Sequence, residues 1–119
     1  MTVKIAIVLL ADISTGGDMG RMANALTTAL EFKQAGDQVK LIFDGAATKW
    51  IGQLAKPEHK YHGLFESVRG SVSGVCRYCA TAYGVADEVR ACGLTLTDEY
   101  QGHPSLRSLV AAGYQIITF

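Results

Sequence analysis

The residues best suited to carry chemistry in this chain are two cysteines three positions apart, Cys76 and Cys79. They lie where a short apolar run, residues 73–75, gives way to a helical pattern, so we expect Cys76 at the start of a helix. The positive end of a helix dipole and free backbone N–H groups lower the pKa of a thiol placed there. The neighbouring cation of Arg77 is expected to act in the same direction. The sequence therefore predicts a reactive thiolate at Cys76, with Cys79 as an auxiliary or resolving thiol.

Three other interpretations of this CxxC motif compete with a single reactive cysteine. Free cysteines often behave as small apolar residues, so the pair could simply pack between a strand and a helix. A zinc site needs more ligands, and Cys92 with a histidine would have to supply them, because the chain has no second CxxC and no HxxxH motif. We therefore expect no metal. A thioredoxin-like dithiol usually follows an early strand, whereas this motif lies two-thirds along the chain and Pro104 is a poor match for the expected cis-proline.

Composition narrows the class of protein. The 119 residues suggest one domain spanning 1–119, which can bury roughly two-thirds of its unfolded surface. The hydrophobic fraction of 49% suits a sheet buried on both faces, a subunit interface, or both. Eleven basic residues balance eleven acidic ones without a basic stripe, which argues against a nucleic-acid partner. The apolar run 5–11 is too short for a membrane span and lacks signal-peptide features, so we expect a cytoplasmic protein with reduced thiols.

Strands and helices alternate along the chain. Residues 4–10 are apolar at successive positions, as in a central parallel strand, and Asp18 is the predicted N-cap of a helix that runs to about Ala35. Further strands are expected at 39–43, 73–75, 94–96 and 114–119, and further helices at 46–55, 61–70, after Cys76 with a break near Gly84, 85–93 and 105–113. This order predicts an α/β fold: a three-layer sandwich around a mainly parallel sheet of about five strands, flavodoxin-like in type.

Ligands of such sheets collect beyond the carboxyl ends of the strands, where Asp44 and Cys76 are both expected. The loop after the first strand reaches the same edge, and its backbone N–H groups around Ser14, Gly16 and Gly17 could bind an anion together with Asp44. This loop lacks both the GxGxxG spacing and a P-loop lysine. A turn into a helix is therefore its main interpretation, and no flavin or other cofactor is expected.

The three histidines are expected to have different roles. His103 precedes the last predicted helix and could serve as a general base or proton relay beside Cys76, with a surface loop histidine as the alternative. His59 and His62 flank Tyr61 in a polar loop and are expected to be solvated. Cys92 lies on the apolar face of its predicted helix and is expected to be a core thiol.

The chain also resembles the DsrE/DsrF-like family of small sulfur-relay proteins, which includes the TusD-type subunits. The resemblance covers nearly the whole chain. It rests on the opening strand KIAIV at 4–8, the glycine-containing loop before the first helix, the segment QAGDQV at 34–39, the segment VCRYCATAYGV at 75–85 and the closing GYQIITF at 113–119.

This resemblance implies sulfur transfer. In the family a cysteine at this strand end accepts sulfane sulfur as a persulfide and hands it to a partner protein. Cys76 matches that cysteine by its spacing to Gly84, and Cys79 matches the second cysteine of members that carry a pair. The resemblance implies a sulfur carrier or sulfurtransferase with donor and acceptor proteins as partners, assembled as a homotrimer or hexamer. A non-catalytic module that binds a small anion or nucleotide, and a CxxC dithiol redox protein, remain as alternatives.

Overall fold

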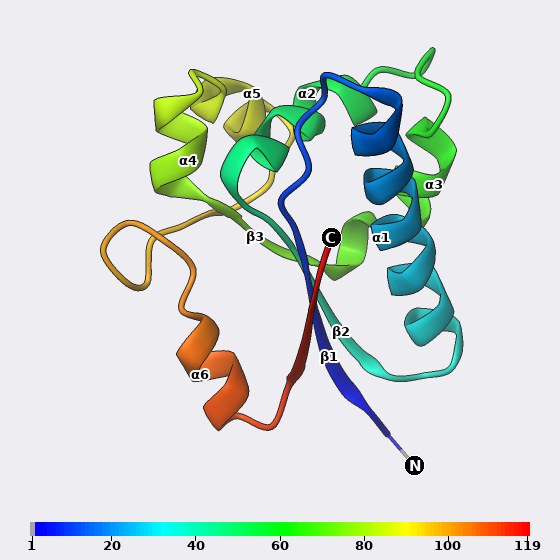
Figure 1. Cartoon of the computed structure of the whole chain (residues 1–119), viewed down its shortest axis with the longest axis vertical. Coiled ribbons are helices and arrows are strands. Elements are labelled where there is room, and N and C mark those ends of the chain that lie inside the picture. The colour runs from blue at the N-terminus through cyan, green and yellow to red at the C-terminus, as the bar shows by residue number, and fades with distance from the viewer. Residues whose placement is uncertain (1) are drawn as a thin grey trace.

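Five parallel strands form a single sheet in the order β4-β3-β2-β1-β5 (Figure 1). The structure is a computed structural model, and it describes residues 2–119. The strands are β1 (Lys4–Leu9), β2 (Gln38–Phe43), β3 (Val72–Cys76), β4 (Leu96–Thr97) and β5 (Gln115–Thr118). The predicted α/β class and the parallel five-stranded sheet are confirmed.

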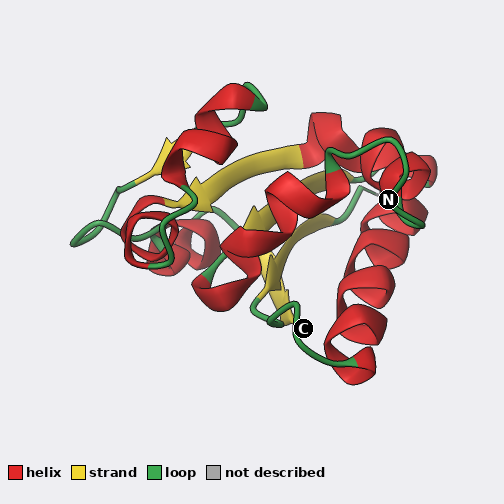
Figure 2. Cartoon of the chain, turned by 90° about the horizontal axis from the view of Figure 1, so that it is seen from above, coloured by secondary structure: helices red, strands yellow, loops and turns green. Residues whose placement is uncertain are grey.

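The helices are distributed unequally over the two faces of this sheet (Figure 2). The connections from β1 to β2, from β2 to β3 and from β3 to β4 each move one strand along the sheet in the same direction. Right-handed crossovers therefore place their helices on one face of the sheet. The step from β4 back to β5 crosses the whole sheet and places α6 on the other face. The helical segments are α1 (Gly16–Gln34), η1 (Gly45–Lys49), α2 (Trp50–Leu54), α3 (His62–Val68), η2 (Arg69–Ser71), α4 (Arg77–Ala82), α5 (Ala86–Ala91) and α6 (Leu106–Ala111).

The core reflects this asymmetry, because alternate residues of β1 point to opposite faces. Ile5, Ile7 and Leu9 belong to the large cluster covered by α1 to α5. Ala6 and Val8 belong to a small cluster to which α6 contributes only Leu109. The third layer of the sandwich is therefore one short helix.

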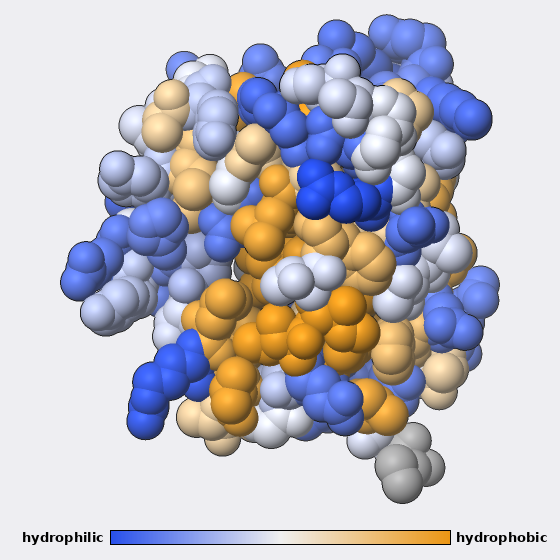
Figure 3. Space-filling model, in the orientation of Figure 1, coloured by the Kyte–Doolittle hydropathy of each residue, from blue (hydrophilic) through white to orange (hydrophobic). Residues whose placement is uncertain are grey.

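Apolar side chains remain exposed around the β5 edge of the sheet. Val110 on α6 is 60% exposed. Ile117 on the edge strand β5 is 37% exposed, and because it pairs with Ile7 it points to the face opposite α6. Figure 3 shows an apolar patch in the middle of the face of the molecule on which β5 lies. Separately, within residues 2–119 no helix combines the length and the apolarity needed to cross a bilayer.

The start of α1 differs from its prediction. Thr15, not Asp18, is the N-cap residue, and Asp18 lies three positions further on. The Thr15 hydroxyl accepts a hydrogen bond from the Asp18 backbone N–H at 3.0 Å, and the Asp18 carboxylate accepts one from the Thr15 N–H at 3.1 Å. This reciprocal capping box explains why an acidic residue in the first turn looked like a cap. The helix expected over 46–55 is likewise divided, into the 3-10 segment η1 and the short α2.

Candidate functional site

Cys76 is the last residue of β3 and the N-cap residue of α4, as the sequence predicted. Its side chain is fully buried. The Cys76 Sγ accepts a hydrogen bond from the backbone N–H of Cys79 at 3.5 Å. The CxxC spacing therefore turns the first cysteine into the cap of the helix that carries the second.

A tight turn between β4 and α6 brings His103 onto Cys76. Gln101 and Gly102 both have positive φ, at 48° and 85°, and Tyr100 and His103 exchange backbone hydrogen bonds of 2.8 Å across them. The Gly102 carbonyl accepts a hydrogen bond from the Tyr78 N–H at 2.9 Å, which ties this turn to the first turn of α4. As a result His103 Nδ1 lies 3.2 Å from Cys76 Sγ.

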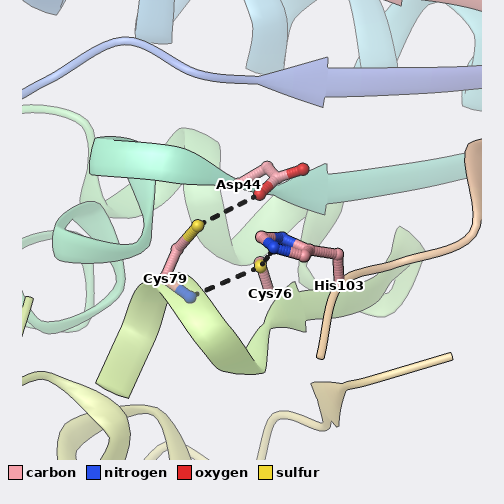
Figure 4. A group of neighbouring side chains, drawn as sticks. All are labelled: Asp44, Cys76, Cys79 and His103. Carbon is pink, nitrogen blue, oxygen red and sulfur yellow. Dashed lines mark hydrogen bonds between the residues drawn. The ribbon is translucent and has the colours of Figure 1, made fainter. Parts of the chain in front are cut away.

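Asp44 completes the group from the end of β2, the strand next to β3. Its Oδ1 accepts hydrogen bonds from the Gly45 N–H at 2.8 Å and from the Cys79 thiol at 3.6 Å. One ligand-type atom from each of Asp44, Cys76, Cys79 and His103 lies within 4.8 Å of all the others (Figure 4). Three segments far apart in sequence thus converge at the carboxyl edge of the sheet.

The pKa of the Cys76 thiol is raised, whereas the sequence predicted that it would be lowered. Burial raises the pKa of the Cys76 thiol to about 12, and hydrogen bonding with Cys79 and the charge of Asp44 act in the same direction. The hydrogen bond from the Cys79 N–H lowers this pKa but does not offset the burial. Arg77 is not among the main causes of this pKa shift, and its exposed guanidinium pairs with Asp98 at 2.6 Å. The expectation that Arg77 and the helix start produce a resting thiolate is therefore wrong.

Access to the two sulfur atoms is unequal. Cys79 is partly exposed, whereas Cys76 is buried. Beside them, over α4 and the Gly102 turn, lies an open cavity of about 450 Å³. Its lining residues are Arg77, Tyr78, Thr81, Ala82, Asp98 and Gly102. None of Asp44, Cys76, Cys79 and His103 lines this cavity; Tyr78 links it to them, because its ring centroid lies 4.8 Å from that of His103.

The other predicted ligand-binding residues do not join this group. Gly16 and Gly17 form the first turn of α1, whose capping box already uses the Asp18 N–H. Ser14 is exposed. Among residues 2–119, no side-chain hydrogen bond links Ser14, Gly16 or Gly17 to the cysteines. Of the predicted anion-binding set, only Asp44 belongs with the cysteines.

Three further expectations are resolved by contacts. His59 and His62 are partly buried rather than solvated, since His59 Nδ1 accepts from the Tyr61 N–H at 3.0 Å and His62 Nδ1 lies 2.7 Å from the Leu54 carbonyl. Cys92 packs against the main core, as predicted.

The possible metal ligands also differ from those considered in the sequence. The sequence predicted no metal and suggested only Cys92 with a histidine as additional ligands, whereas Asp44 and His103 are the residues that lie beside the CxxC pair. The sequence placed Asp44 and Cys76 at one edge of the sheet without indicating that their side chains meet. The only local signal was that each lies at the end of a strand.

Comparison with known proteins provides a relative of similar length. "Uncharacterized protein MJ0733" of Methanocaldococcus jannaschii is 35% identical over 100 residues, which cover 84% of this chain and 81% of the relative. The chain belongs to the MJ0733 family. No family model matches it.

Two solved structures share the fold of this MJ0733 family member. BT1422 from Bacteroides thetaiotaomicron, a conserved protein of unknown function, matches with a TM-score of 0.64 and 20% identity, covering 96% of this chain and 94% of the other. The YchN protein from E. coli matches over the whole of both chains with a TM-score of 0.59 and 13% identity. At these identities the two likenesses show that the chain shares its α/β fold with both proteins.

Proposed function

We propose that this protein is a TusD-type sulfur-relay protein that carries sulfane sulfur as a persulfide on Cys76 and passes it to a partner protein. The observation that supports this most strongly is the 3.2 Å contact between Cys76 Sγ and His103 Nδ1 within a chain that resembles the DsrE/DsrF-like family. Because the raised pKa means that the Cys76 thiol holds its proton tightly, Cys76 needs an adjacent base to become a nucleophile. His103 lies close enough to be that base.

The proposed loading step conserves atoms and protons. His103 takes the proton from the Cys76 thiol, and the Cys76 thiolate attacks the outer sulfur of a persulfide, R–S–SH, on the donor protein. A new S–S bond forms on Cys76 while the donor's S–S bond breaks. His103 returns its proton to the departing donor thiolate. The products are Cys76–S–SH and R–SH, and delivery to an acceptor thiol is the same exchange in the other direction.

Cys79 would act on the loaded state. Its thiolate can attack the inner sulfur of the Cys76 persulfide, which forms a Cys76–Cys79 disulfide and releases hydrogen sulfide. The Cys79 thiol donates to Asp44 at 3.6 Å, so this proton has an acceptor beside it. Cys79 would in this way resolve a persulfide that finds no acceptor, or protect the site as a disulfide.

We further propose that the chain works as a single domain in the reducing cytoplasm and assembles as a homotrimer or hexamer. The exposed apolar surface around β5 and α6 supports assembly, because Val110 on α6 and Ile117 on the edge strand β5 are both exposed there. Light scattering coupled to gel filtration measures the assembly. A monomer at all concentrations would contradict it.

The test of the function is intact mass after brief exposure of the reduced protein to polysulfide, followed by peptide mapping. A reductant-sensitive gain of sulfur on the Cys76 peptide is expected, and it should be absent in Cys76→Ser, altered in Cys79→Ser and unchanged in the control Cys92→Ser. Equal loading of Cys76→Ser and wild type would overturn the assignment. Because resolution by Cys79 also ends in a disulfide, the alternatives are distinguished in Cys79→Ser: loss of two hydrogens in wild type with no sulfur gain on Cys76 in Cys79→Ser would identify a dithiol redox protein. Free thiols with no sulfur gain in either protein would favour the binding module.

A further inference from the structure

We propose that Asp44, Cys76, Cys79 and His103 form a four-ligand site for a zinc ion. All four side chains offer a ligand atom, and these atoms lie within 4.8 Å of one another (Figure 4). This proposal does not depend on the sulfur-relay function, although it uses the same two sulfur atoms. It also assigns a role to Asp44, which sulfur transfer on Cys76 does not require.

The spacing of the four atoms fits tetrahedral zinc. With Zn–S bonds of about 2.3 Å and Zn–N or Zn–O bonds of about 2.0–2.1 Å, ligand atoms in a tetrahedron lie about 3.3–3.8 Å apart. The distance from Cys76 Sγ to His103 Nδ1 is 3.2 Å, and that from Cys79 Sγ to Asp44 Oδ1 is 3.6 Å. The widest pair, within 4.8 Å, would have to close by about 1 Å when the ion binds.

Supporting contacts of the kind found around zinc sites are already present. The Cys79 N–H donates to Cys76 Sγ, and the Gly45 N–H donates to Asp44 Oδ1, so a backbone N–H already orients each of these two ligand atoms. The His103 ring is held by the turn before it and by the Tyr78 ring, whose centroid is 4.8 Å away. Such outer contacts orient ligands and strengthen their hold on the metal.

The donor set selects zinc over other common ions. Two thiolates and an imidazole exclude Mg²⁺ and Ca²⁺, which take oxygen ligands, and the carboxylate disfavours Cu(I). Binding replaces the thiol protons of Cys76 and Cys79 by the metal, so the reaction is Zn²⁺ plus the dithiol protein giving the zinc protein plus two protons. Four protein ligands leave no open position, so the ion would close the site rather than activate water.

The two proposed uses of the site exclude each other in one molecule. A Cys76 thiolate bound to zinc is unavailable to attack a donor persulfide, and a Cys76 persulfide displaces the sulfur atom from its ligand position. Zinc occupancy would therefore hold the protein in a state that accepts no sulfur.

The test is titration of the reduced, metal-free protein with Co²⁺, which substitutes for zinc and reports its ligands by absorption. We expect one equivalent to produce thiolate-to-cobalt charge-transfer absorption together with the visible bands of a tetrahedral ion, and one equivalent of Zn²⁺ to abolish both. Cys79→Ser should about halve the charge-transfer intensity. Asp44→Asn and His103→Gln should weaken Co²⁺ binding at least tenfold. Cys92→Ser, which removes the one cysteine outside the group, should change nothing.

Two results would overturn the proposal. One is the absence of tetrahedral bands when thiol titration shows three free thiols and circular dichroism shows folded protein. The other is a cobalt spectrum that persists unchanged in Cys79→Ser or disappears in Cys92→Ser. No sulfur donor is present in this titration, so its failure leaves the sulfur-relay proposal standing. Failure of polysulfide loading in the metal-free protein likewise leaves the zinc site standing.

Discussion

Replacing Asp44 by asparagine should make Cys76 more reactive. The asparagine side chain has the same size and can still accept from the Gly45 N–H, so the local cap is preserved while the negative charge is removed. That charge is one of the causes that raise the pKa of the Cys76 thiol. The substitution should therefore lower this pKa and increase the thiolate fraction at any pH below it.

The magnitude follows from the geometry. A unit charge within 4.8 Å of Cys76 Sγ interacts with a thiolate by about 3.5 kcal/mol at an effective dielectric constant of about 20. This is equivalent to a pKa change of about 2.5 at about 1.4 kcal/mol for each tenfold change. Asp44 is partly exposed, so solvent reduces the interaction, and burial remains the first cause of the raised pKa. We expect a fall in pKa of about 1, and hence about a tenfold faster alkylation of Cys76.

The assay is iodoacetamide alkylation of metal-free protein at pH 8, with the rate of each cysteine followed by peptide mapping. Steric protection of the buried thiol is common to wild type and variant, so it cancels in the ratio of rates. Asp87→Asn removes an equivalent charge from exposed α5 and serves as the matched control, with no expected change. If Asp44→Asn changes the Cys76 rate by less than twofold, Asp44 does not govern the thiol and the electrostatic reasoning is refuted.

Three other perturbations test separate parts of the structure. Arg77→Gln should change the alkylation rate of Cys76 by less than twofold, because the guanidinium is exposed and paired with Asp98; a fivefold loss would restore the role that the sequence suggested. Gly102→Ala should lower the free energy of unfolding in urea by about 1–2 kcal/mol, because φ is +85° there and the new Cβ would lie 3.3 Å from Tyr78 Cβ; unchanged stability would show that the turn tolerates a side chain. The raised pKa of Cys76 also makes stability depend on alkaline pH. Its contribution is complete below the ordinary thiol value of 9.0 and is lost as the pH rises toward about 12, so wild type should lose stability faster than Cys76→Ser above pH 9. Parallel pH profiles would contradict the burial of that thiol.

The sequence predicted the features that depend on local signals. The unbroken apolar run of β1 marked a central parallel strand, and positive-φ glycines such as Gly36 ended helices where expected. The same logic placed Cys76 at a strand end and a helix start. These predictions succeeded because periodicity, caps and turn residues act over a few residues.

Predictions that depended on packing were less successful. Arg77 follows Cys76 directly, yet its side chain points away to Asp98, and sequence adjacency gave no sign of this. The burial that dominates the pKa of Cys76 arises from helices and turns packed around the end of β3. His103 was a candidate partner, but its position depends on positive φ at Gln101, a residue type that rarely adopts it.

Asp44 and the cysteines are brought together by the fold, and no sequence motif predicts that they meet. Because β2 and β3 are neighbours in a parallel sheet, their carboxyl ends meet, and the residues following Phe43 and Val75 become spatial neighbours. In isolation, Asp44 and Cys76 oppose each other, since the carboxylate charge keeps the thiol protonated. A cation placed between them reverses this relation, because it attracts both anions. The charge of Asp44, which adds to burial in making Cys76 a poor resting nucleophile, thus also suits the group to the proposed metal ion, and under that proposal removal of the metal or proton controls the sulfur.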